Sequence, residues 1–248
     1  FFKQKTAYEI MSGDWSSDVC SSDLDEIGFT RPGASAELIT VPAWLAHVLN
    51  ENVSDESAVL AEPTAVVTQA FMKAKTKSDS KILIIGDGTI ALIAATMAKT
   101  YNPKFIHMLG LKEGQSEIAK SAGVDQFLTT PTEDKYDLII EAAGSPARIS
   151  AAIGQLVRGG TLLLLGYPGQ QKTVAITVDD VINGDLSIVG SFGSSLDAWK
   201  KTVAMLNSGE LNLGYLVTHK FPLGDFAKAI EALKSAPAPR GKIALIIN

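Results

Sequence analysis

The stretch that most constrains the fold of this chain is KILIIGDGTIALIAATMAKT, residues 81–100. It opens with four large apolar side chains in a row, Ile82 to Ile85, which is typical of a strand buried on both faces. A glycine-rich turn comes next, and an alanine-rich helical pattern follows over residues 88–100. Because a strand buried on both faces needs a helix layer on each side of its sheet, this stretch indicates an α/β fold.

The same alternation continues along the chain. Short apolar runs predict strands at residues 81–86, 104–110, 125–130, 136–144, 159–166, 185–191, 215–221 and 242–247. Helical patterns lie at residues 88–100, 116–123, 145–157, 195–209 and 223–235, and a Ser/Asp start with Pro63 in the following first turn marks a further helix near residues 54–63. Residues 28–43, GFTRPGASAELITVPA, are interpreted as turn, strand and turn. The alternation predicts a doubly wound parallel sheet of the Rossmann type.

Residues 86–91, GDGTIA, have the pattern G-x-G-x-x-A between the first of these strands and its helix. In a dinucleotide-binding turn Gly86 would allow the tight bend, Gly88 would let the backbone approach a pyrophosphate, and Ala91 would permit close helix packing. The amide groups of Thr89 and Ile90, with the helix dipole, would then face the phosphates. The alternative is an ordinary glycine-rich turn, and the strand–turn–helix context favours dinucleotide binding.

At this point the chain resembles the medium-chain dehydrogenase/reductase family, in its zinc-dependent alcohol and polyol dehydrogenase branch. The matching pieces, in the family's order, are GASAELITVPA, LAEPTAVVTQAF, ILIIGDGTIALIAA, IAKSAGVD, YDLIIEAAGSP, RGGTLLLLG, IVGSFG, LVTHKFPL and GKIALII. The resemblance implies an incomplete GroES-like β domain at residues 25–63, a Rossmann dinucleotide-binding domain at 64–193, and a return segment at 194–248 that completes the first domain. The family's other zinc ligands would lie upstream of these residues.

The resemblance also implies site residues. It places Ala143, Gly144, Leu165, Gly166 and Val189 along the cofactor cleft. Lys242 is a candidate for the pyrophosphate, with a solvated lysine before a strand as the alternative. Glu62 is a candidate zinc ligand or zinc neighbour, with a solvated carboxylate at a helix N-terminus as the alternative. No residue of this chain is assigned as catalytic.

Residues 1–24 are interpreted differently. FKQKTAYEI and DWSSDVCSSDL match, residue by residue, the translation of two halves of a sequencing-library adapter, and the three residues between fall where a variable index would lie. A secretory signal is excluded because no apolar run follows the two lysines, and a transit peptide is excluded because the segment has acids and no arginine. A genuine acidic tail is the alternative. We therefore expect the native sequence to begin near Asp25, as part of a longer protein, and residues 1–24 to remain unpacked.

Composition excludes several classes. Cys20 is the only cysteine, so a disulfide framework is ruled out. The net charge of −5 with no basic stripe argues against a nucleic-acid partner, and no apolar run approaches the roughly 18 residues of a membrane span. The histidines, His47, His107 and His219, lack partners at ligand spacing and are interpreted as structural or surface residues. A cytoplasmic location is expected.

The implied activity of the complete enzyme is hydride transfer between a secondary alcohol, such as a polyol, or its ketone and NADP or NAD, with zinc as Lewis acid. NADP is favoured because Gly110 stands where an NAD-specific acid would be, with Lys112 near enough to pair with a 2′-phosphate; in the alternative register Glu113 meets the ribose. The rival functions are a zinc-free quinone-reductase-like enzyme, which Glu62 argues against, and a non-catalytic nucleotide-sensing module, which the return segment argues against. A homodimer or homotetramer is expected for the complete enzyme, and no dehydrogenase turnover for this chain alone.

Overall fold

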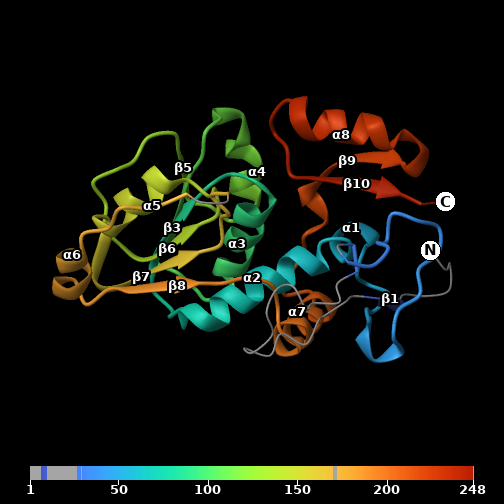
Figure 1. The fold of residues 1–248 in the computed structure, drawn as a ribbon, viewed down its shortest axis with the longest axis horizontal. Coiled ribbons are helices and arrows are strands. Elements are labelled where there is room, and N and C mark those ends of the chain that lie inside the picture. Colours follow the sequence, from blue (N-terminus) through green and yellow to red (C-terminus); the bar gives the residue numbers. More distant parts are fainter. Residues whose placement is uncertain (1–6, 10–26, 29, 170–171, 248) are drawn as a thin grey trace. The chain divides into compact units, whose positions relative to one another are not determined.

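The computed structural model describes residues 7–9, 27–28, 30–169 and 172–247. It divides into two compact units, one formed by Gln69–Phe192 and the other by Phe1–Thr68 with Gly193–Asn248 (Figure 1). The division falls inside helix α2, Ala61–Ala74. Each unit is described by itself below.

The unit of residues 69–192 is built on a six-stranded sheet in which every neighbouring pair is parallel. Its order is β5-β4-β3-β6-β7-β8, with the strands β3 (Lys81–Ile85), β4 (Phe105–Leu109), β5 (Gln126–Leu128), β6 (Tyr136–Glu141), β7 (Leu156–Leu164) and β8 (Ser187–Gly190). The chain thus winds outward from β3 in one direction and then from β6 in the other. This confirms the predicted doubly wound sheet, whose strand order reverses between β3 and β6.

The central strands are apolar because helices cover both sheet faces. Helix α3 (Thr89–Lys99) and helix α4 (Ser116–Ser121) follow β3 and β4, whereas α5 (Pro146–Ile153) follows β6 and packs on the opposite face (Figure 1). Strand β3 is buried from Ile82 to Ile85, so its alternate side chains fill two separate cores. On the α5 side the core contains Leu83, Ile85, Leu109, Tyr136, Ile139, Ile149, Ala152, Ile153, Leu156 and Leu162.

One helix end in this unit differs from the prediction, and one helix was not predicted. The helix expected over residues 145–157 ends at Ile153, because Leu156 pairs in register with Tyr136 and already belongs to β7. Helix α6 (Val178–Asn183) was not predicted, since its residues lack a buried apolar stripe.

The unit of residues 1–68 and 193–248 contains a parallel pair of strands, β9 (Val217–Pro222) and β10 (Lys242–Ile246), packed on helix α8 (Phe226–Ser235). It also contains α1 (Asp55–Ala58) and α7 (Leu196–Ser208). Both begin at a serine whose hydroxyl accepts an N–H from the first turn, Ser54 for α1 and Ser195 for α7. Gly209 ends α7 in a left-handed conformation, which matches the predicted end of that helix.

The predicted strand within residues 28–43 is wrong. Residues 32–42 have no strand, and Leu38 remains 78% exposed. A strand requires a neighbour to pair its backbone groups, and none of the described residues pairs with this run. The first regular element after residues 32–42 is η2 (Ala43–Leu45), a 3-10 turn that leads into strand β2 (Ala46–Val48).

Of residues 1–24, which we expect to remain unpacked, the structure describes three. Residues Ala7–Glu9 form strand β1, which pairs antiparallel with β2 so that Tyr8 lies opposite His47. A strand as short as β2 accepts any extended segment on its edge, since the pairing uses backbone groups alone. The remaining residues of that segment lie outside the described part of the chain.

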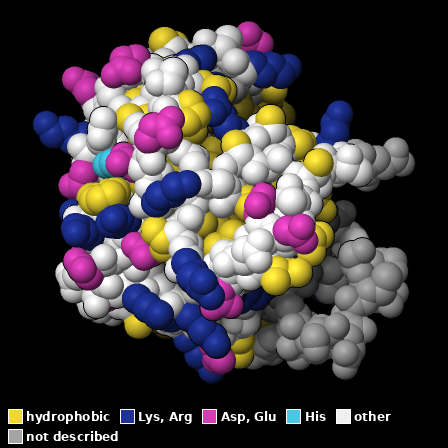
Figure 2. Space-filling model, turned by 90° about the vertical axis from the view of Figure 1, so that its left-hand side faces the viewer, with side chains coloured by type: hydrophobic (Ala, Val, Ile, Leu, Met, Phe, Trp, Pro, Cys, Tyr) yellow, Lys and Arg dark blue, Asp and Glu magenta, His cyan; other side chains and the backbone are white. Residues whose placement is uncertain are grey.

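Charges on the surface are mixed. Figure 2 shows Lys and Arg side chains interspersed with Asp and Glu side chains over the face it presents. Among the described residues, every helix is too short or too polar to traverse a lipid bilayer.

A polar cluster inside the sheet unit makes stability depend on pH. His107 Nδ1 lies 3.1 Å from the Tyr136 hydroxyl and 3.7 Å from Asp134 Oδ2. Burial lowers the pKa of His107 below its ordinary value of 6.5, although the carboxylates of Asp134 and Asp125 act in the opposite direction. The unfolded chain therefore binds this proton more readily, so the contribution of His107 is complete above pH 6.5 and is lost as the pH falls through the lowered pKa.

We accordingly expect wild type to lose more stability than His107→Gln between about pH 7.5 and about pH 5. Urea unfolding of both proteins at the two pH values measures the difference. Equal losses in the two proteins would show that His107 does not carry this dependence.

Candidate functional site

The glycine-rich turn joins β3 to α3 at the carboxyl end of the sheet. Gly86 has φ +117°, a conformation that only glycine adopts readily, and its N–H donates to Leu109 O at 2.9 Å. A Cβ on Gly86 would lie 3.2 Å from the Ala142 carbonyl carbon, in the loop after β6. The backbones that follow the two central strands are therefore close together here, at the reversal of strand order where α/β sheets bind ligands.

Gly88 leaves the end of α3 open. It is the N-cap residue of the helix, has φ −85°, and a Cβ built on it meets no described residue within 4 Å. Thr89 and Ile90 form the start of the first turn, as predicted. The first amides of a helix have no intrahelical acceptor and carry the positive end of the dipole, so the start of a helix is a favourable place for an anion such as a pyrophosphate.

The structure brings together four of the other predicted residues, Ala143, Gly144, Leu165 and Gly166, at the ends of β6 and β7. Their loops meet at the buried carboxylate of Glu141, which is 0% exposed. Glu141 Oε1 accepts the N–H of Ala143 and Oε2 that of Gly144, each at 3.1 Å.

Gly166, in the loop after β7, packs against Glu141 and the loop after β6. Its N–H and that of Leu165 both donate to Glu141 O, at 2.9 and 2.8 Å. A Cβ on Gly166 would overlap Gly144 N and lie 2.5 Å from Glu141 Oε2. Glu141 and these glycines hold one wall of the carboxyl edge in a fixed shape.

Gly110, the predicted position beside a 2′-phosphate, is packed against two side chains. Gly110 is buried at the end of β4, and a Cβ there would overlap the Phe127 ring, lying 2.8 Å from its Cε2, and lie 2.7 Å from Asp87 Oδ2. The glycine thus accommodates the Phe127 ring and the Asp87 carboxylate, and the room that it would leave for a 2′-phosphate stays a prediction. Lys112 is exposed two residues further on.

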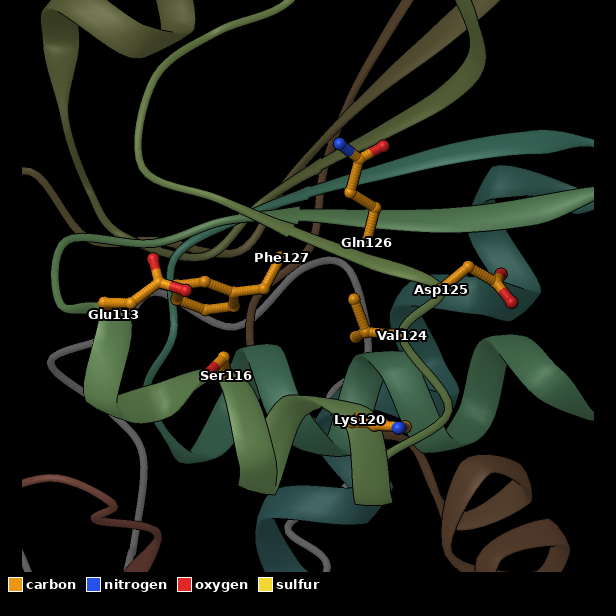
Figure 3. Close-up of a pocket in the computed structure, with 7 residues that line it drawn as sticks. All are labelled: Glu113, Ser116, Lys120, Val124, Asp125, Gln126 and Phe127. Carbon is orange, nitrogen blue, oxygen red and sulfur yellow. The ribbon is translucent and has the colours of Figure 1, made fainter.

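The alternative candidate, Glu113, lies on a different feature. It lines a cavity of about 270 Å³ between α4 and β5, with Ser116, Lys120, Val124, Asp125, Gln126 and Phe127. Figure 3 shows Glu113 beside the Phe127 ring at one end of this cavity and Lys120 toward the other. No residue of the glycine-rich turn lines it, so this position gives no support to a ribose contact by Glu113.

Val189 lies near the carboxyl end of the edge strand β8, where it pairs in register with Leu163 of β7, two residues before Leu165. Together with Ser187 it lines a cavity of about 670 Å³ bordered by residues 73–80, 137–138 and 157–161. These include the start of β3 and the first residues of β6, at the amino end of the sheet. The place of Val189 along the cofactor cleft stays a prediction.

The remaining candidates belong to the other unit. Glu62 is exposed in the first turn of α2, a position that the helix dipole favours for an acid. Lys242 is half-buried at the start of β10. In the part of the chain that the structure describes, no three His, Cys, Asp or Glu side chains gather closely enough to hold a metal ion.

The histidines contact neighbours within their own units. His47 stacks on Trp199 with ring centroids 6.1 Å apart, and His219 Nδ1 lies 2.9 Å from the Thr218 hydroxyl. Burial, and secondarily Lys200, lowers the pKa of His47.

Sequence reasoning missed two acids in this region, Glu141 and Asp87. An acid at the end of an otherwise apolar strand, as in YDLIIE, was a signal for Glu141, because a buried carboxylate requires a set of donors. The signal for Asp87 was its position between the two turn glycines, together with the presence of a glycine, Gly110, directly after β4.

Comparison with known proteins gives the family. A family model described as the glucose dehydrogenase C-terminus matches residues 55–236. L-threonine 3-dehydrogenase of Yersinia pestis (strain Pestoides F) is 26% identical over 232 residues, which cover 88% of this chain and 66% of that protein. The same enzyme of Escherichia fergusonii is 27% identical with the same coverage. The chain thus spans just under two thirds of the length of these relatives.

Solved structures share the fold. A short chain alcohol dehydrogenase from E. coli CFT073, complexed with NADH, has a TM-score of 0.84 at 24% identity and covers 90% of this chain and 68% of that one. A protein from Sinorhizobium meliloti 1021 assigned as a zinc-binding dehydrogenase, bound to NADP, has a TM-score of 0.81 at 21% identity, with 89% and 68% covered. The predicted relationship to the medium-chain alcohol and polyol dehydrogenases is confirmed, and the chain belongs to the glucose dehydrogenase C-terminus family.

Proposed function

We propose that this chain binds a nicotinamide dinucleotide at the carboxyl edge of its six-stranded sheet, with the pyrophosphate at Gly86–Ile90. The observation that carries the proposal is Gly88, which caps an eleven-residue helix and whose added Cβ would contact none of the described residues. Gly86 supports it by requiring a glycine conformation directly before. An ordinary tight turn would have no need of the second glycine, since its φ of −85° suits any residue.

The complete protein is proposed to be an NAD(P)-dependent oxidoreductase that acts on a secondary alcohol, such as a polyol, or on the corresponding ketone. The family match and the dehydrogenase names of the relatives support this activity. When bound, the nicotinamide accepts or donates the hydride, and zinc, in members that use it, polarises the substrate oxygen. Ala143, Gly144, Leu165 and Gly166 would shape the edge against which the cofactor lies.

Two further roles remain proposals. Glu62 is a zinc ligand or a carboxylate beside zinc, which its charge and hard oxygen atoms suit. Lys242 binds the pyrophosphate. Assembly of the complete enzyme as a homodimer or homotetramer, and its place in the cytoplasm, are proposed from the resemblance to the family alone.

Titration of the chain with NADH and, separately, with NADPH tests the dinucleotide proposal. Nicotinamide fluorescence should rise and saturate with at least one of the two, because a nicotinamide transferred from water to a protein cleft is shielded from quenching. AMP should compete, since it carries the adenosine half of both. Failure of both nucleotides to bind a folded sample would overturn the proposed function.

A further inference from the structure

Asp87 connects the glycine-rich turn to the loop after β4. Its Oδ2 accepts the N–H of Leu111 at 2.8 Å and that of Lys112 at 3.4 Å. Its backbone carbonyl accepts a hydrogen bond of 2.8 Å from the side-chain amide of Gln115, which is only 5% exposed. The backbone of Asp87 is therefore tied to Gln115, and its carboxylate is tied to the loop after β4 through Oδ2.

The Asp87 carboxylate lies beside Gly110, the residue that stands where dinucleotide-binding folds carry their ribose-binding acid. In such folds an acid at the end of the second strand, roughly 20 residues after the glycine motif, binds the ribose 2′-hydroxyl. The second strand here is β4, and the residue after it is Gly110. An acid at Gly110 would begin at a Cβ only 2.7 Å from Asp87 Oδ2, so the Asp87 carboxylate occupies the space that such a side chain would enter.

We propose that Asp87 is the specificity-determining residue for the cofactor, and that it makes the site select NAD(H) over NADP(H). In this arrangement the ribose-binding carboxylate belongs to the glycine-rich turn and not to the end of β4, and Gly110 leaves room for it. This inference rests on the proposed dinucleotide site. It reverses the preference for NADP that Gly110 and Lys112 predicted from sequence.

The chemistry of the carboxylate supports this direction. Within the described residues, the hydrogen bonds to the Asp87 carboxylate all go to Oδ2, which leaves Oδ1 to accept from a ribose hydroxyl. A 2′-phosphate at the same place would put two negative groups in contact, and like charges at an interface are strongly unfavourable. Attraction between Lys112 and a 2′-phosphate would offset this repulsion only weakly, since the lysine side chain is exposed and an exposed ion pair contributes little.

The experiment compares NADH and NADPH affinities of wild type, Asp87→Asn and Asp137→Asn by fluorescence titration. Asparagine keeps the shape and one acceptor oxygen but removes the charge. Asp137 is the matched control, because its Oδ2 also accepts a backbone N–H, that of Lys81 at 2.8 Å, but at the amino end of β3. We expect wild type and the control to bind NADH at least about tenfold more tightly than NADPH, and the ratio to fall by about tenfold in Asp87→Asn.

Several results would overturn the inference while leaving the dinucleotide site intact. One is NADPH binding to wild type as tightly as NADH, and another is an unchanged ratio in a folded Asp87→Asn. If Asp87→Asn fails to fold, the Lys112→Ala variant provides the test. An unchanged ratio of NADH to NADPH affinity in that variant supports the inference, and a selective loss of NADPH affinity contradicts it. Failure of wild type to bind either nucleotide would instead contradict the proposed function.

Discussion

Replacement of Gly166 by alanine is expected to lower the free energy of unfolding of the sheet unit by about 3 kcal/mol, at the upper end of what overpacking usually costs. The added methyl group would overlap Gly144 N and come within 2.8 Å of Gly144 Cα. Gly144 cannot yield easily, because it has φ +66° and its own Cβ position lies 2.6 Å from the Tyr167 carbonyl carbon. The clash therefore falls on backbone, and it also disturbs the hydrogen bonds that Glu141 accepts.

Chemical denaturation of wild type, Gly166→Ala and Gly190→Ala measures this effect. Gly190 ends β8, has an ordinary backbone conformation, and a Cβ there meets nothing within 4 Å. Its alanine variant should match wild type or be slightly more stable, because alanine loses less conformational freedom on folding. A Gly166→Ala protein as stable as the control would show that the junction of the β6 and β7 loops is not tightly packed.

The fold could be predicted from local sequence because its strands are recognisable as continuous apolar runs. Runs such as ILII and LLLL are apolar at every position, as strands of a sheet covered on both faces require. Right-handed crossovers then place the helices after β3 and after β6 on opposite faces. The strand expected near Leu38 failed for a reason that local sequence does not contain, since a strand forms only where a neighbour is available to pair with it.

The site was predicted only as far as backbone conformation determines it. Gly86 and Gly88 lie where the motif placed them, since their roles depend on the turn itself. The surroundings of Gly110 could not be predicted, because they come from residues 23 positions earlier and 17 positions later, Asp87 and Phe127. Contacts of that range depend on how loops fold over one another, which no periodicity reveals.

The second large effect concerns Gly88. Its replacement by alanine should leave the fold intact, because the new methyl group points into open space and the backbone conformation is ordinary. Bound nucleotide would fill that space, since the second glycine of the motif lets the backbone approach the pyrophosphate. We expect affinity for NADH to fall by about 100-fold, as the methyl group pushes the phosphates away from the amides of Thr89 and Ile90.

Titration of NADH into wild type, Gly88→Ala and Gly154→Ala is the most direct test of the dinucleotide site. Gly154 caps α5 with φ −69°, and a Cβ there makes only an ordinary contact, 3.6 Å from Ala151 O. The site assignment predicts that all three proteins unfold at similar temperatures and that Gly88→Ala alone loses nucleotide binding. Wild-type affinity in a folded Gly88→Ala protein would contradict it, because the pyrophosphate could not then lie on the turn between β3 and α3.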